Sequence, residues 1–101
     1  LGEAIQRAHP RAHVVKTLNS VSAHLLVDQG QLKQPHSVFI ASNDDAARRE
    51  VTRLLESSGW TDIVDLGDLG ACRAMEQLIP LWMRLEQKFG GPQFNLAVVR
   101  R

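Results

Sequence analysis

The sequence predicts an α/β fold in which Rossmann-like β-α repeats form a partial, mainly parallel sheet with a long C-terminal helix. Short apolar runs alternate with helical segments three times, polar turns separate them, and glycine or proline closes each helical segment. Such connections place strands parallel through right-handed crossovers. Because three short strands make a thin sheet, we expect the 101 residues to be a single domain or a fragment of a larger doubly wound domain.

The first repeat is predicted to contain a helix over residues 2–9, a strand over 13–18 and a second helix over 21–28. Pro10 ends the first helix, because proline restricts the residue before it and cannot continue a helix. Since Leu1 is not an initiator methionine, we expect the chain to be a piece of a longer protein.

The second repeat begins with a continuously apolar strand over residues 37–41, typical of a strand covered on both faces. Residues 42–45 are rich in side chains that cap helices. The helix that follows has apolar residues at helical spacing: Ala47, Val51, Leu54 and Leu55. Gly59 is expected just beyond its end, where a left-handed backbone is favoured.

The third repeat comprises a strand over residues 62–65, a turn over 66–70 and one long helix over 71–89. Pro80 should kink this helix, because it removes the hydrogen bond to the Glu76 carbonyl. An extended segment over 94–99 ends the chain. The long helix carries an apolar stripe of Met75, Leu78, Ile79, Trp82, Leu85 and Phe89.

Composition argues against several classes of protein. Twelve basic and eleven acidic residues give a net charge of +1, which lacks the basic excess of a nucleic-acid binder. No apolar run is long enough to cross a membrane. The single Cys72 cannot form an internal disulfide, so a cytoplasmic location is expected. No metal site is predicted, because Pro10 breaks the helix that would align His9 with His13.

Ligands of open α/β sheets bind beyond the carboxyl ends of the strands. This rule selects the loops at Asn19-Ser20, at residues 42–45 and at residues 65–70, which we expect to meet at a common edge. Asn19 or Ser20 could cap the next helix, and Asn19 could also contact a planar ring or a carboxamide. Both roles are compatible.

The other two loops are poor phosphate sites. Residues 42–45 are predicted to cap a helix, because Ser, Asn and Asp are preferred at helix starts. Their two carboxylates would repel phosphate, so a phosphate site is not expected there. Residues 65–70 contain only G-x-x-G, and Asp65 and Asp68 would repel a pyrophosphate. No complete G-x-G-x-x-G or P-loop occurs in the chain. Arg73 is expected on a solvated face, paired with Glu76 or Gln77, and Cys72 as an inert buried thiol.

Four stretches carry a family resemblance: HVVKTLNSVSAHLL, VFIASNDDAARREVTRLLESSGW, VDLGDLGACRAMEQL and FNLAVV. In this order they resemble the carboxyl-terminal half of the deazaflavin-coenzyme-dependent NADP reductases, a family of dinucleotide-binding oxidoreductases. The cytoplasmic domain of the six-transmembrane metalloreductases is similar. The resemblance covers nearly all of the chain, although the family's Asp-Ala-Gly-Pro-Leu turn reads Asp-Leu-Gly-Asp-Leu here.

The resemblance implies hydride transfer between NADP(H) and a flavin or deazaflavin-like acceptor, with no side chain acting as acid or base. It places the nicotinamide over the loop matched by Asn19, Ser20 and Val21. It places the acceptor beside a turn and the helix that follows, at Asp65, Leu66, Gly67, Asp68, Leu69 and Arg73. The half with the glycine-rich loop is absent, so weak NADP binding is expected.

A second hypothesis treats the chain as a non-catalytic dimerisation or interaction module. The apolar stripe of residues 71–89 would then be the binding surface, and the free sheet edge would recruit a partner. The same stripe predicts a homo-oligomer for the reductase hypothesis.

Overall fold

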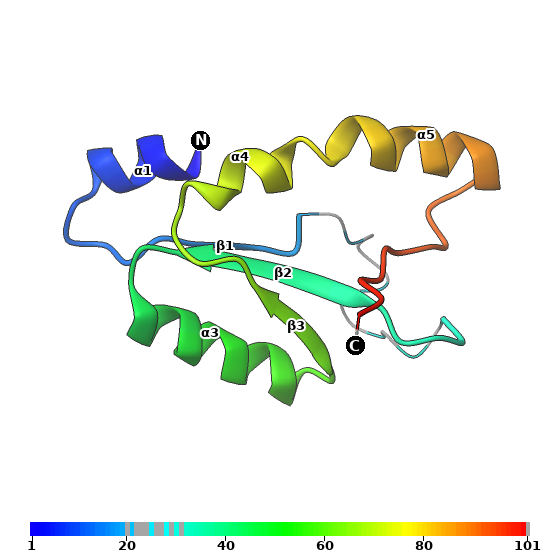
Figure 1. Cartoon of the computed structure of the whole chain (residues 1–101), viewed down its shortest axis with the longest axis horizontal. Coiled ribbons are helices and arrows are strands. Elements are labelled where there is room, and N and C mark those ends of the chain that lie inside the picture. The colour runs from blue at the N-terminus through cyan, green and yellow to red at the C-terminus, as the bar shows by residue number, and fades with distance from the viewer. Residues whose placement is uncertain (20, 22–24, 26–27, 29, 31, 101) are drawn as a thin grey trace.

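The computed structural model describes every residue except 20, 22–24, 26–27, 29, 31 and 101. A small sheet lies between α3 on one face and α1 and α4 on the other (Figure 1). The predicted helix over 21–28 falls largely outside the described residues. The elements are α1 (Gly2–Ala8), β1 (Val15–Thr17), β2 (Ser37–Ser42), α3 (Asp45–Ser57), β3 (Asp62–Asp65), α4 (Ala71–Glu76) and α5 (Ile79–Phe89).

The sheet is mixed, with the strand order β1-β2-β3. β2 and β3 are parallel, as predicted, with Ile40 opposite Asp65. β1 is antiparallel to β2, with Thr17 opposite Ile40, so the expectation of parallel pairing is wrong for this strand. Side-chain bonds fix the antiparallel register at both ends. Thr17 Oγ1 donates to the Phe39 carbonyl at 2.6 Å, and Ser42 Oγ donates to the Val14 carbonyl at 2.7 Å.

The side of the sheet facing α3 is held by a cluster of Val38, Leu55 and Trp60. α3 begins where predicted, because Asp44 Oδ1 accepts a hydrogen bond from the Ala47 amide at 2.7 Å. Gly59 follows the helix with φ +103°, which confirms the predicted left-handed residue.

The side facing α4 has its own buried cluster of Ala41, Leu69, Cys72 and Met75. β2 supplies residues to both clusters, so the prediction of a strand covered on both faces is confirmed. The helix α1 closes on α4 at Gly2, where a Cβ atom would lie 2.8 Å from Cys72 Sγ.

The long C-terminal helix predicted over 71–89 is two helices, so the prediction of one kinked helix is wrong. α4 ends at Glu76, and α5 starts at Ile79 with Pro80 in its first turn. Proline has no N–H to bond the Glu76 carbonyl, but the first turn of a helix needs no such donor. The chain therefore breaks before the proline and begins a new helix there.

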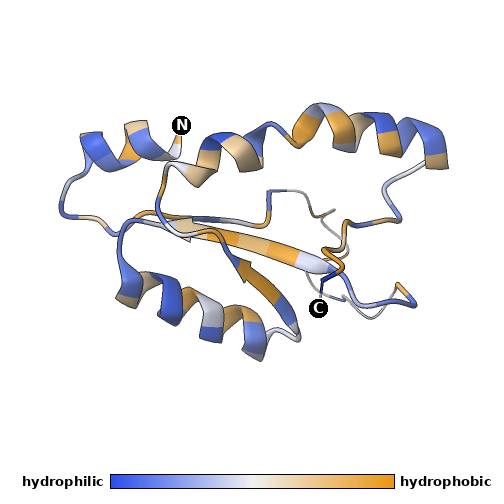
Figure 2. Ribbon diagram, viewed as in Figure 1, coloured by the Kyte–Doolittle hydropathy of each residue, from blue (hydrophilic) through white to orange (hydrophobic). Residues whose placement is uncertain are grey.

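The break divides the predicted apolar stripe. Met75 is 1% exposed in the core, whereas Ile79 is 47% and Phe89 is 65% exposed. No residue of α5 is buried, and apolar and polar residues alternate along it in Figure 2. Within the described part of the chain, no helix has both the length and the apolar character needed to span a bilayer.

The segment after α5 returns to the sheet near the start of β2 (Figure 1). The Ser37 amide donates to the Leu96 carbonyl at 2.9 Å, and Ser37 Oγ accepts from the Val98 amide at 2.9 Å. Arg100 forms an ion pair with Asp62 at 2.6 Å.

Candidate functional site

The carboxyl ends of β2 and β3 are joined by the Arg48 side chain, which is only 16% exposed. Its guanidinium donates to Asp65 at 3.1 Å, to the Ser42 carbonyl at 2.5 Å and to Asp45. Burial lowers the pKa of Arg48, but hydrogen bonds and charges of Asp65 and Asp45 raise it overall. The Asp65 carboxylate is therefore paired with Arg48 within the protein. The spacing of the two residues in the sequence did not predict this ion pair.

The turn after β3 is fixed by its own side chains. Asp65 Oδ1 accepts from the Gly67 amide at 2.8 Å, and Gly67 has φ +90°. Asn43 Oδ1 accepts from the Leu69 amide at 3.0 Å, which ties the turn to the end of β2. Leu66 and Asp68 are exposed, whereas Leu69 is fully buried. Of these residues, Leu66 and Asp68 can present side chains to a ligand.

Arg73 lies on α4 and points into solvent with its side chain 72% exposed. Its Nε donates to Glu3 Oε1 at 2.9 Å, so it is paired with α1. The expectation of side-chain pairing with Glu76 or Gln77 is wrong, because the fold brings Glu3, 70 residues away in the sequence, against Arg73.

Asn19 follows a strained residue and contacts α4. Leu18 has φ +60°, a left-handed conformation that costs a leucine about 1–2 kcal/mol. Asn19 Nδ2 donates to the Met75 carbonyl at 2.7 Å. Its Oδ1 is buried and accepts no hydrogen bond from the described residues. This unmet hydrogen-bonding capacity is unusual for a buried polar atom.

The other two residues predicted beside Asn19 do not extend this contact. Val21 packs against the cluster of Val38, Leu55 and Trp60, towards α3. Ser20 lies outside the described residues.

The loop at Asn19 and the turn at 65–70 do not share an edge of the sheet. Because β1 is antiparallel to β2, its carboxyl end lies at the opposite end of the sheet from those of β2 and β3. The expectation of a common edge is therefore wrong. The two regions are linked by α4, which starts after the turn and carries the Met75 carbonyl that holds Asn19 one residue before its end. Six helical residues span about 9 Å, so both regions remain near one another.

Cys72 is the only cysteine and is 1% exposed. Burial, followed by the charge of Glu76, raises the pKa of its thiol. The prediction that Cys72 is buried is therefore confirmed. Among the residues that the structure describes, no three His, Cys, Asp or Glu side chains form a metal-binding group.

Two of the cavities in the described part of the chain lie at opposite ends of β2. One, of about 350 Å³, is beside its carboxyl end and is lined by Arg7, His13, Asn43 and Asp44, among others. The Asp44 carboxylate in this cavity already has a partner within the chain, because His13 Nδ1 lies 3.2 Å from Asp44 Oδ2. Sequence spacing gave no signal for Arg7 and His13, because they precede the first strand and meet α3 only through the fold.

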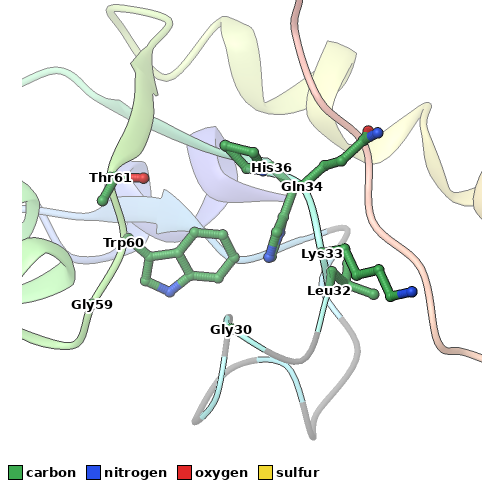
Figure 3. A pocket seen from close by; sticks show the side chains of 9 residues that line it. Gly30, Leu32, Lys33, Gln34, His36, Gly59, Trp60 and Thr61 are labelled. Atoms are coloured by element: carbon green, nitrogen blue, oxygen red, sulfur yellow. The ribbon is translucent and has the colours of Figure 1, made fainter.

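The other cavity, of about 250 Å³, lies before β2 and β3, beside Trp60 and His36 (Figure 3). The two rings meet edge to face, 5.1 Å apart at 76°. This cavity is at the amino ends of the strands, away from both predicted ligand regions.

The chain matches a solved structure over nearly its whole length. It is 48% identical over 98% of its residues, with a TM-score of 0.95, to a protein from Arthrobacter sp. FB24 that carries the provisional assignment of F420-dependent NADP reductase. The chain covers 45% of that protein. No protein-family model matches the sequence. The structural match confirms the family resemblance found in the sequence motifs.

Proposed function

Because the chain belongs to the same family as the Arthrobacter reductase, we propose that it is part of an NADP-dependent oxidoreductase. The proposed reaction is hydride transfer between NADP(H) and a flavin or deazaflavin-like acceptor. The observation that carries the proposal is 48% identity over 98% of the chain. Since the chain covers 45% of that reductase, the proposal concerns a contribution to a larger site.

The proposed role of Asn19 is to hold the nicotinamide. Its Nδ2 is fixed by the Met75 carbonyl, and its Oδ1 is left free to accept from the carboxamide N–H. The left-handed Leu18 supports this role, because backbone strain is frequently retained at functional sites. Ser20 and Val21 are proposed to complete the loop through their backbone.

The acceptor is proposed to lie against the turn at 65–69 and the exposed Arg73. The turn is held in place because Asp65 and Asn43 accept hydrogen bonds from the Gly67 and Leu69 amides, and Arg48 in turn holds the Asp65 side chain. A rigid surface of this kind would orient a planar acceptor and keep water away from it. NADP(H), when bound, would supply or accept the hydride, so no residue here needs to act as an acid or base.

The phosphates of NADP do not fit the residues of this chain. The carboxyl edge of β2 and β3 carries Asp44, Asp45 and Asp65, and the chain has no glycine-rich phosphate loop. We therefore propose that a glycine-rich half supplies the phosphate site. A coding sequence upstream of Leu1 with G-x-G-x-x-G after a strand would support this arrangement.

The test is a titration of the complete gene product with NADPH, followed through the Asn19 side-chain amide by NMR. NADPH oxidation by flavin and deazaflavin acceptors is measured on the same protein. Asn19→Ala should weaken NADPH binding about three- to ten-fold, because one hydrogen bond is lost. Asn95→Ala is the matched control, since its Oδ1 is also buried without a partner among the described residues. Equal effects of the two substitutions, or no oxidation of NADPH by any acceptor, would contradict the proposal.

A second candidate function is a dimerisation or interaction module. The exposed apolar residues of α5 favour it: Ile79, Leu81, Met83 and Phe89 are 47–65% exposed. An interface that covers α5 would bury these exposed apolar side chains.

Sedimentation velocity across a range of concentrations tests this candidate, with and without NADP. If α5 forms a homodimer, the mass should rise above 11.3 kDa and Met83→Lys should return it to the monomer value. Leu54→Lys is the control, because Leu54 is 64% exposed on α3. A wild-type chain that stays monomeric at every concentration would exclude a homodimer through α5.

A further inference from the structure

Lys16 is a charged residue in the middle of β1, opposite Ala41 of β2. Residues directly opposite one another in an antiparallel pair share a face of the sheet. Ala41 packs in the cluster with Cys72 and Met75, so Lys16 lies on the face covered by α4. Its side chain is 30% exposed, and its Nζ lies 3.9 Å from Glu76 Oε1.

Glu76 is the last residue of α4 and immediately follows Met75, whose carbonyl holds Asn19. Lys16, in β1, and Asn19, two residues beyond the strand, therefore contact two consecutive residues at the end of α4. Glu76 Oε1 is buried without a hydrogen-bond partner among the described residues. Its charge is offset by Lys16.

We infer that Lys16 and Glu76 are a positioning pair for Asn19. Their attraction holds the last turn of α4 against β1, and this turn carries the carbonyl that orients the Asn19 amide. With Nδ2 held in this way, the orientation of the whole Asn19 amide, Oδ1 included, is fixed. This inference rests on the proposed function and assigns a role to Lys16, which the sequence motif contains but the proposed reaction does not use.

The test uses the complete gene product, with NADPH as the probe and the Asn19 side-chain amide resonances as the readout. Lys16→Met and Glu76→Gln should shift these resonances and speed their exchange with water. Both should weaken NADPH binding about two- to five-fold, the range for partly exposed ion pairs. Lys16→Arg should restore binding, because it keeps the positive charge.

Glu3→Gln is the matched control. It breaks the Arg73–Glu3 ion pair, which joins the same helix α4 to α1, but does not touch Glu76 or Met75. It should leave the Asn19 amide unshifted. If these charges only help to pack α4 against its neighbours, all three charge-removing variants should shift the Asn19 resonances and weaken NADPH binding to the same extent. Circular dichroism of each variant verifies that the fold is retained.

The outcomes separate this inference from the proposed function. In one outcome, NADPH shifts the Asn19 amide resonances of the wild type, but Lys16→Met and Glu76→Gln bind NADPH as tightly as the wild type does. The positioning pair is then overturned and the proposed function stands. If NADPH leaves wild-type Asn19 unshifted, the proposed role of Asn19 fails, and the positioning inference fails with it. Unchanged Asn19 resonances in both variants also overturn the inference.

Discussion

The sheet with α3 and the helix α5 are stabilised to very different degrees. Val38 and Ile40 of β2 are at most 1% exposed, and α3 packs against all three strands. α5 has no buried residue, and its aromatic contacts are Trp82 and Phe89 with Phe94, at 5.3 and 6.0 Å between ring centroids.

The contrast shows that an apolar periodicity does not by itself indicate burial. α3 and α5 both carry apolar residues at helical spacing, but α3 has a sheet beneath it and a side-chain cap at its start. α5 lacks a side-chain cap hydrogen bond and begins at a break imposed by Pro80. A helix whose apolar side chains remain exposed is the part of this chain suited to binding another surface.

The largest expected difference is between core truncations in the two regions. Ile40→Ala should lower the free energy of unfolding by about 2–5 kcal/mol, because it removes a fully buried side chain and leaves a cavity. Met83→Ala on α5 should change it by less than about 0.5 kcal/mol, because Met83 is 55% exposed. Urea denaturation of both variants measures the difference, and equal losses would show that α5 is packed as tightly as β2.

A smaller effect is expected from the helix cap that α3 has and α5 lacks. Asp44→Ala should cost about 1 kcal/mol, because the Ala47 amide loses its acceptor. Glu50→Ala, at an exposed position of the same helix, is the control and should be nearly neutral. If urea denaturation gives the same stability for both variants, the cap does not stabilise α3.

The smallest expected effect concerns the tie between β3 and the C-terminal segment. Hydrogen bonds from Arg100 and then Ser37 lower the pKa of Asp62. A carboxyl whose pKa is lowered by folding stabilises the protein above its ordinary pKa of about 4, and this stability is lost as the pH falls through the folded value. Asp62→Asn should therefore lower stability at pH 7 by less than about 1 kcal/mol.

The difference between wild type and Asp62→Asn should disappear in acid, as measured by thermal unfolding across a pH series. Asp68→Asn is the control, because Asp68 is exposed and bonds only the nearby Gly70 amide. A pH dependence that is the same in both variants would show that Asp62 does not couple the C-terminal segment to β3.

Local chemistry made part of the fold predictable. Asp44 caps α3 through an amide three residues away, and Gly59 adopts its left-handed conformation within one residue of the helix cap. The continuous apolar run of β2 was sufficient to predict a strand buried on both faces. Each of these features depends on neighbours in the sequence, so the residues themselves determine them.

The family was predictable from the sequence, but the arrangement of the candidate site was not. The motifs that resemble the reductase family pointed to Asn19 and the turn at 65–69, and the family was confirmed by the structural match. Their placement at a common edge was wrong, because the direction of β1 depends on bonds from Thr17 and Ser42 to distant residues. The partners of Arg73 and Asn19, Glu3 and Met75, are 70 and 56 residues away.

The sequence by itself determined where the main described helices and strands occur, because capping, proline geometry and hydrophobic period act over a few residues. Only the tertiary structure decided that β1 runs antiparallel, that α4 links the two proposed ligand regions and that α5 remains exposed. These features depend on which distant surfaces meet, and the free energy of such contacts is set by the whole packed chain.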